Sequence, residues 1–243
     1  MTPDYRAALY GSYVRGHQGV LPEQPNLPRM AADVLRHLPQ GRGNPKILDI
    51  GCGQGMLVRF LLRNGYDDVS GIDVSASQIA LALQLGTPNV EHADLFEFAG
   101  REAGSCDALV ALDVIEHFDR ADVQRVFDAF SRLLRPGGTL ILRTPNGSSP
   151  YSGRYLFSDL THGLIYTNHS LDQVAAVTGF TDVRVYPVRP VGSGALQRIR
   201  RMLWTIIEAL IVAPLVVETG QLRGHIVTQN LVCTAVKDTA SMT

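Results

Sequence analysis

The spacing of hydrophobic positions changes at Lys46, and from there short apolar runs alternate with stretches of helical periodicity. Before that point, residues 1–45 are polar and rich in proline, and we expect short helices near 4–14 and 28–38. Between 46 and 146, five apolar runs predict strands, and short connections join them to the predicted helices. This alternation predicts βαβ units, and therefore a parallel sheet with helices on both faces.

The alternation ends after residue 146. A polar and aromatic loop, 147–169, precedes a predicted helix at 170–178 and two strands, FTDVRVYPV and HIVTQNLVCTAV. An arginine-rich and apolar insertion over 188–224 separates these two strands. We expect a single domain over 1–243 that carries this insertion.

Composition narrows the classes of partner and compartment. The chain has 243 residues, with 22 Lys and Arg against 23 Asp and Glu, so its net charge of −1 argues against nucleic acid as a partner. Its three cysteines are far apart, which excludes a disulfide scaffold and a clustered zinc site. Without a secretory signal or an apolar run long enough to span a bilayer, we expect a cytoplasmic protein.

Three glycines follow the first predicted strand in the segment LDIGCGQG. Gly51, Gly53 and Gly55 allow a tight turn and the close approach of a ligand to the backbone. Asp49 precedes this turn, and Asp73 and Asp94 stand at the ends of the next two strands. The carboxyl ends of parallel strands meet at one edge of the sheet, so these acids converge beside the glycine turn.

These segments resemble a known family. ILDIGCGQG, GIDVSASQI, HADL, LDVIEHF and LLRPGGTLILRTPN are similar, in order and spacing, to the motifs of class I S-adenosylmethionine-dependent methyltransferases. The resemblance implies an α/β, Rossmann-like fold: a seven-stranded, mostly parallel sheet in the order 3-2-1-4-5-7-6, with helices on both faces. It also implies S-adenosylmethionine as cofactor.

The resemblance assigns roles to the residues at the sheet edge. Asp73 would hold the ribose, and Asp94, with Leu95 beside it, the adenine amine. Asp49 would reach the methionine amino group, and Leu112 would flank the sulfonium. The three glycines, Gly51, Gly53 and Gly55, would line the methionine moiety.

The segment Asp113–His117 follows the fourth strand and resembles the D/E-x-x-E-H motif of ubiquinone-pathway O-methyltransferases. Glu116 and His117 are therefore candidate catalytic residues. Asp113, Glu116 and His117 could also ligate Mg²⁺ or Zn²⁺. We do not favour a metal, because related methyltransferases without one carry the same motif and the two residues could simply shape the pocket.

Residues 157–171 resemble a D-x-T-H…(F/Y)-T…S-L stretch found in polysaccharide- and lipopolysaccharide-pathway methyltransferases. Histidine is the side chain that serves most often as a general base, and His162 is our first candidate for that role, oriented by Asp159. The alternative is that both residues only organise a polar loop. Tyr166 is a candidate acceptor-binding residue.

Relatives of this family often close an N-terminal helix over the acceptor. By that resemblance, residues 1–45 would form a helical lid, and Tyr13, His17 and Arg29 are candidate substrate-binding residues. Surface aromatics that pack on the domain are the alternative.

Between Asp182 and Glu208 the chain has five arginines and no acid, and a long apolar helix begins within this stretch. Three interpretations remain open for 196–218: packing on the sheet edge or in a homodimer, a peripheral membrane contact at the inner face of the membrane, or a groove for the lipid tail of an acceptor. The leading functional hypothesis is an S-adenosylmethionine-dependent O-methyltransferase that acts on a sugar hydroxyl of a surface glycan or its precursor. The alternative is a quinone-pathway or other small-molecule O-methyltransferase.

Overall fold

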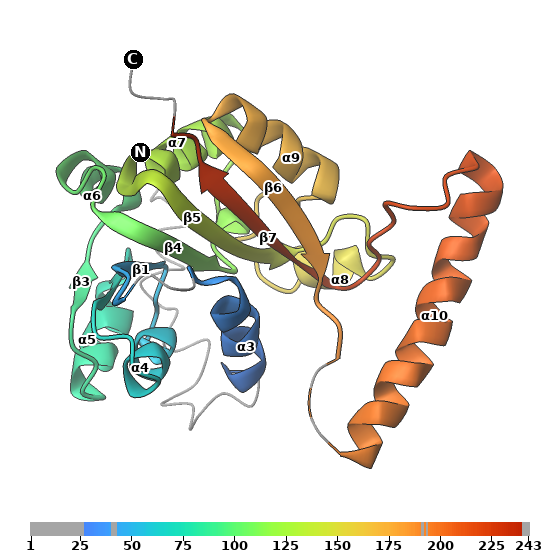
Figure 1. Ribbon diagram of the computed structural model, residues 1–243, viewed down its shortest axis with the longest axis horizontal. Coiled ribbons are helices and arrows are strands. Elements are labelled where there is room, and N and C mark those ends of the chain that lie inside the picture. Colours follow the sequence, from blue (N-terminus) through green and yellow to red (C-terminus); the bar gives the residue numbers. More distant parts are fainter. Residues whose placement is uncertain (1–26, 40–42, 191, 193, 240–243) are drawn as a thin grey trace.

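The computed structural model describes residues 27–39, 43–190, 192 and 194–239 (Figure 1). Its seven strands form one sheet in the order β3-β2-β1-β4-β5-β7-β6. Strands β1 to β5 pair in parallel, and β7 runs antiparallel to both β5 and β6. This confirms the predicted sheet. The strands are β1 Ile47–Ile50, β2 Val69–Asp73, β3 Val90–His92, β4 Cys106–Leu112, β5 Leu134–Pro145, β6 Phe180–Pro187 and β7 Asn230–Lys237.

Helices cover both faces of the sheet, as the alternation predicted (Figure 1). Alternate side chains of one strand serve opposite faces, because successive residues of a strand point to opposite sides: Ile47 packs with one core and Leu48 with the other. The first core includes α3 Leu27–His37, α4 Met56–Arg63 and α5 Ala76–Gln84, and the second includes α6 Leu95–Arg101, α7 Val123–Leu133 and α9 Asn168–Val177.

Local signals explain where several helices begin. The Ser75 side chain accepts a hydrogen bond from the Gln78 amide and caps α5 as expected. Thr167 and Ser170 form a reciprocal capping box at the start of α9, two residues before the predicted start.

Some elements differ from the predicted ones. β5 begins at Leu134, so the Pro-Gly-Gly segment belongs to an irregular part of this strand and not to a connecting turn. Two short helices, α6 and α8 Ser152–Leu156, lie where only loops were expected.

The insertion forms one long helix, α10 Ala195–Thr219. It stands apart from the sheet and from the helices that cover it (Figure 1). Its two flanking strands are neighbours, because Pro187 of β6 pairs with Leu231 of β7. The chain therefore leaves the sheet, forms α10 and returns to the same place in the sheet.

Candidate active site

The glycine turn joins β1 to α4 with left-handed backbone at three positions. The φ angles of Gly51, Gly53 and Gly55 are 69°, 52° and 69°. A Cβ atom at Gly51 would lie 2.6 Å from Val114, and one at Gly55 would lie 2.5 Å from Thr87. Any side chain at these two positions would therefore clash as well as strain the backbone.

Asp73, at the end of β2, holds this turn in place. Its two carboxylate oxygens accept hydrogen bonds from the amides of Gly53, at 2.9 Å, and Ser75, at 2.7 Å. Burial raises the pKa of Asp73, while the two amides and His92 act in the opposite direction. The carboxylate is thus oriented by the backbone at the edge where the acids were predicted to converge.

Gly53 borders a space that the described residues leave open. The nearest atom to a Cβ built there is Oε1 of Gln78, at 4.0 Å. That oxygen is buried and has no hydrogen-bond partner. A buried carbonyl oxygen without a donor is costly, so a donor from a ligand above Gly53 would stabilise this arrangement.

The other predicted cofactor residues are Asp49, Leu112, Asp94 and Leu95. Asp49 is 3% exposed, and burial, with the charge of Asp73, raises its pKa well above the usual range. Leu112 is half-buried at the end of β4.

Asp94 caps α6, because one of its carboxylate oxygens accepts hydrogen bonds from the amides of both Phe96 and Glu97. The side chain of Leu95 packs into the core.

A second polar group gathers beside the end of β4. Nδ1 of His117 lies 2.7 Å from Oγ1 of Thr161, which lies 2.7 Å from Oδ1 of Asp159. The Thr161 hydroxyl has one proton, and the carboxylate can only accept it, so Thr161 accepts from Nδ1–H of His117. The lone pair of the neutral imidazole is then on Nε2.

Asp159 is suited to the end of this chain of hydrogen bonds. Burial opposes its ionisation, but the amide and hydroxyl of Thr161, with His117 and His162, outweigh that effect and lower the pKa of Asp159. Its carboxylate was expected to orient His162, but the hydrogen bonds show that it acts on His117 through Thr161. Thr161 was not among the predicted site residues, although it is the threonine of the D-x-T-H stretch and lies two residues after Asp159.

His162 lies against His117, with ring centroids 4.8 Å apart. Nδ1 of His162 is 2.7 Å from the carbonyl oxygen of Tyr155, which can only accept, so this ring also carries its lone pair on Nε2. The structure therefore brings both predicted histidines together and fixes the same tautomer in each.

Glu116 is almost fully buried beneath the two histidines. Thr144 donates to its Oε2 at 3.1 Å, whereas Oε1 is buried without a partner. Burial, and then the neighbouring Asp113, raise the pKa of Glu116 well above its usual range. A neutral carboxylic acid is therefore favoured at this position.

Ligand atoms of Glu116, His117 and His162 lie within 4.8 Å of one another, so these three could hold a metal ion. Asp113 was the third ligand considered from the sequence, but it forms an ion pair with Arg143 at 2.6 Å. Burial raises the pKa of Asp113, although Arg143 and His162 oppose the shift.

The remaining acceptor candidates are placed less favourably or lie outside the described residues. Tyr166 is 3% exposed and its hydroxyl donates to the carbonyl of Ile115, so it packs in the core, and its role in acceptor binding stays a prediction. Tyr13 and His17 lie outside the described residues, as does most of the proposed lid. Arg29 belongs to α3, which packs on the sheet.

A family model described as a methyltransferase domain matches residues 24–185, which is more than half of the chain. The chain belongs to the class I S-adenosylmethionine-dependent methyltransferases. Its strand order and glycine turn were expected from this family, and both are present.

Curated relatives carry the name ubiquinone biosynthesis O-methyltransferase. The protein of Psychrobacter arcticus is 31% identical over 63% of this chain and 65% of its own length. That of Acinetobacter baumannii strain ACICU is 33% identical over 49% of this chain and 50% of its own length. The chain thus spans between about half and two thirds of these relatives.

Solved structures share the fold at lower identity. A SAM-dependent methyltransferase from Archaeoglobus fulgidus superposes with a TM-score of 0.64 at 21% identity, covering 96% of this chain and 100% of its own. Phosphoethanolamine N-methyltransferase 2 of Haemonchus contortus, in complex with S-adenosylmethionine, gives 0.61 at 20% identity, covering 96% and 57%. Proteins named for an O- and an N-acceptor are thus both similar to this chain, and the fold alone does not identify the acceptor atom.

The described residues fit S-adenosylmethionine. Gly53 leaves room next to the unpartnered Oε1 of Gln78, and Asp73 is oriented at the adjacent strand end. The buried Asp49 would be ionised again by the positive amino group of the cofactor, which would then be bound by charge.

Replacing Gln78 with Leu is expected to separate binding from stability. The variant removes a buried oxygen without a partner, so the thermal unfolding midpoint should rise, while affinity for S-adenosylmethionine should fall about tenfold, the equivalent of one hydrogen bond. Calorimetric titration and thermal unfolding measure the two quantities. Gln84→Leu, an exposed position on the same helix, is the control. Unchanged affinity in Gln78→Leu would remove Gln78 from the cofactor site.

Glu116→Gln is expected to change the pH dependence of stability. Because the pKa of Glu116 is raised in the folded state above the usual 4.5, its contribution to stability is complete below about pH 4.5 and is lost as the pH rises through the raised value. The neutral Gln should therefore gain stability relative to the wild type as the pH rises above 4.5, and not below it.

Thermal unfolding of both proteins across this range measures the difference. Glu218→Gln, at an exposed position, should follow the wild type throughout. If Glu116→Gln also followed it at every pH, Glu116 would not be neutral in the folded protein.

Proposed function

We propose that this methyltransferase acts on a hydroxyl oxygen, with His117 as the general base. The observation that supports this most is the hydrogen-bonded series His117–Thr161–Asp159. Within it, His117 belongs to the segment after β4 that also contains Val114, the residue packed on the glycine turn. S-adenosylmethionine supplies an electrophilic methyl group. The residues of the chain have to orient the hydroxyl and accept its proton as the new C–O bond forms.

The hydrogen-bonded series stabilises His117 after it accepts that proton. When Nε2 takes it, the ring becomes a cation, and its Nδ1–H remains bonded to Thr161 and, through it, to the Asp159 carboxylate. The low pKa of Asp159 keeps that carboxylate ionised, so its charge stabilises the cation. His162, held by the Tyr155 carbonyl, lies against the same ring and would contact the acceptor.

Two acceptor classes fit this site, each through a separate observation. A phenolic hydroxyl of a quinone-type ring is favoured by the curated relatives, and a histidine can deprotonate a phenol with a small pKa mismatch. A sugar hydroxyl of a glycan precursor is favoured by the polar loop that carries Asp159 and His162, the segment similar to polysaccharide-pathway methyltransferases.

The proposed location is the cytoplasm. The three cysteines are buried and free, which fits a reducing compartment.

Thr161→Val is expected to lower kcat by about tenfold to 100-fold with little change in affinity for S-adenosylmethionine, because the base loses its orientation and its link to Asp159. Thr161→Ser keeps the hydroxyl and should restore most of the activity. His117→Asn should lose at least about 100-fold, and His162→Asn less. Full activity in Thr161→Val, or a larger loss in His162→Asn than in His117→Asn, would contradict the assignment of the base.

The acceptor class can be tested by offering the purified protein S-adenosylmethionine with one acceptor at a time. A polyprenylated catechol, a lipid-linked sugar and a primary amine of similar size form the panel, and mass spectrometry detects the added methyl group. Methylation of the catechol or of the sugar, dependent on His117, is the expected outcome. Methylation of the amine alone would overturn the proposal of a hydroxyl acceptor.

A further inference from the structure

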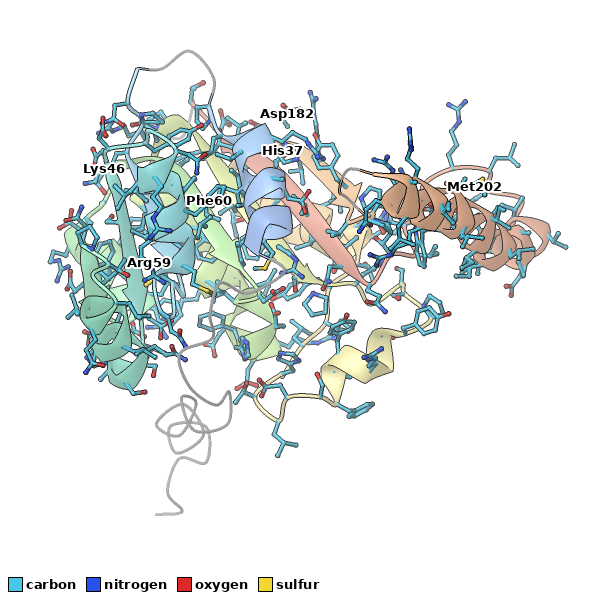
Figure 2. All side chains as sticks on the ribbon, turned by 90° about the horizontal axis from the view of Figure 1, so that it is seen from below. His37, Lys46, Arg59, Phe60, Asp182 and Met202 are labelled. Carbon is cyan, nitrogen blue, oxygen red and sulfur yellow. The ribbon has the colours of Figure 1, made fainter. Side chains whose placement is uncertain are left out.

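Helix α10 exposes more apolar surface than any other described helix. Its most apolar 18-residue window has a mean hydropathy of 1.8, and 0% of that window is buried. Figure 2 shows Met202 on this helix, well away from the body of the protein. Contiguous exposed apolar surface of this kind marks an interaction site. The large exposed side chains are Leu196, Ile199, Met202, Leu203, Ile206, Ile207, Leu210 and Val217.

These side chains form one stripe along α10. At 100° per residue they occupy roughly 140° of the helix circumference. The opposite face is partly covered and includes Trp204, Glu208 and Leu215. The helix is therefore amphipathic in its exposure, with one face toward the protein and an apolar face toward the surroundings.

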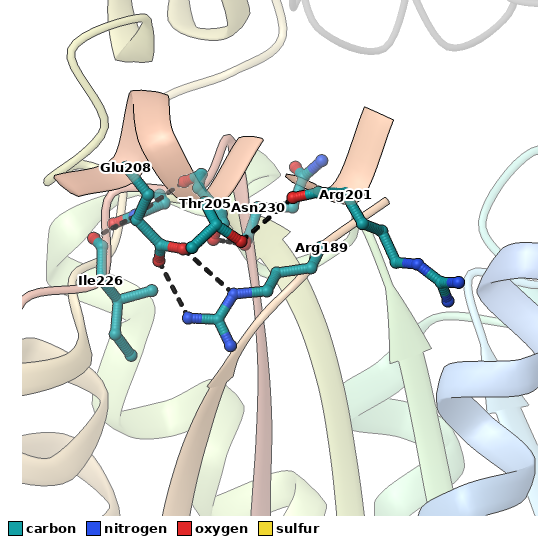
Figure 3. Close-up of polar contacts among 8 residues, drawn as sticks. Arg189, Arg201, Thr205, Glu208, Ile226 and Asn230 are labelled. Atoms are coloured by element: carbon teal, nitrogen blue, oxygen red, sulfur yellow. Dashed lines mark hydrogen bonds and ion pairs between the residues drawn. The ribbon is translucent and has the colours of Figure 1, made fainter. Parts of the chain in front are cut away.

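A bidentate ion pair fixes which face turns outward. Arg189, just after β6, donates to both carboxylate oxygens of Glu208, at 3.1 and 3.0 Å (Figure 3). The only acid in the middle of α10 is thus held on the face toward the protein. This leaves the apolar stripe without an acidic side chain.

The topology excludes a spanning orientation, although α10 is long and apolar enough for one. Both ends of the insertion attach to one place in the sheet, where Pro187 pairs with Leu231. If α10 crossed a bilayer, residues 220–229 would have to cross back, about 30 Å of hydrocarbon, without helical or sheet hydrogen bonds and with Arg223 among them. Unsatisfied backbone groups make such a crossing prohibitive.

The arginines at the start of α10 indicate what kind of surface the apolar stripe binds. Arg198, Arg200 and Arg201 are exposed in its first two turns, and Arg198 and Arg200 lie on opposite borders of the apolar stripe. Guanidinium groups beside an apolar stripe match the phosphates of an anionic lipid surface, where the stripe enters the acyl boundary. We propose that α10 lies in the plane of an anionic membrane surface and anchors the enzyme there.

A second copy of the chain fits the stripe less well. Five of its residues follow spacings of three and four, as in a two-helix coiled coil, but Arg198 and Arg200 on the two borders would then flank the seam between the helices. A parallel pair would also place the arginines of the two copies side by side. If the proposed function holds, this anchoring presents the active site to acceptors with lipid tails.

Cosedimentation of the full-length protein with vesicles tests the proposal without using turnover. Vesicles of phosphatidylglycerol and phosphatidylcholine should bind the wild type at least about tenfold more tightly than phosphatidylcholine alone, with the difference reduced by salt. The double variant Ile206→Asp/Leu210→Asp should lose binding by at least about tenfold while retaining its unfolding midpoint and its affinity for S-adenosylmethionine. Arg198→Gln/Arg200→Gln/Arg201→Gln should lose the preference for phosphatidylglycerol.

Matched exposed apolar positions on other helices provide the controls. Leu83→Asp on α5 and Val177→Asp on α9 should bind vesicles as the wild type does. Failure of the wild type to bind either vesicle, or a dimer in light scattering that Ile206→Asp/Leu210→Asp abolishes without any vesicle binding, would overturn the proposal. Because neither readout involves methyl transfer, these outcomes are independent of the proposed function.

The single tryptophan reports the orientation. Trp204 is half-buried on the face toward the protein, so quenchers on the lipid acyl chains should affect its fluorescence little. In Trp204→Phe/Ile206→Trp the indole lies in the stripe and should be quenched strongly by the same lipids. Equal quenching in both proteins would contradict an in-plane helix with this face outward.

Discussion

The hydrogen bond from the Gly53 amide to the Asp73 carboxylate joins the ends of the first two strands, and the site depends on it. It fixes the turn between β1 and α4 and orients the carboxylate. A left-handed backbone at Gly51 allows Val114 to pack on the turn, which ties the segment after β4 to the same edge. Because parallel strands end at the same edge of the sheet, the predicted cofactor residues and the Glu116–His117 segment are neighbours in space although they are far apart in sequence.

The parts of the structure that the sequence could predict are those with local or periodic signals. Apolar runs separated by short turns determine a buried parallel sheet, and Ser75 is a recognisable helix cap. Thr161 stands in the D-x-T-H stretch, but nothing in that stretch shows its hydrogen bond to His117, a residue distant in sequence. The burial of Tyr166 likewise depends on packing against residues distant in sequence. The residues next to it in the sequence are equally consistent with an exposed aromatic side chain.

The acceptor side uses burial and charge differently from the cofactor side. Beside the glycine turn, two backbone amides orient the Asp73 carboxyl group. Beneath the histidines, Glu116 is kept neutral by burial, while Asp159, held by Thr161, stays ionised. Carboxyl groups with opposite protonation preferences around a histidine pair are typical of sites that move a proton. The insertion between β6 and β7 contains none of these site residues, so a change in the insertion leaves the histidines and carboxyl groups of the site unaltered.

In the proposed mechanism, Thr161 and Asp159 hold Nδ1–H of His117, so that Nε2 accepts the proton of the acceptor. Long-range nitrogen–proton correlation spectra of the histidine side chains measure the tautomer directly. Neutral His117 is expected to carry its proton on Nδ1 in the wild type and to lose this preference in Thr161→Val. A neutral His117 ring protonated on Nε2 in the wild type would contradict the mechanism, because that nitrogen could not serve as the base.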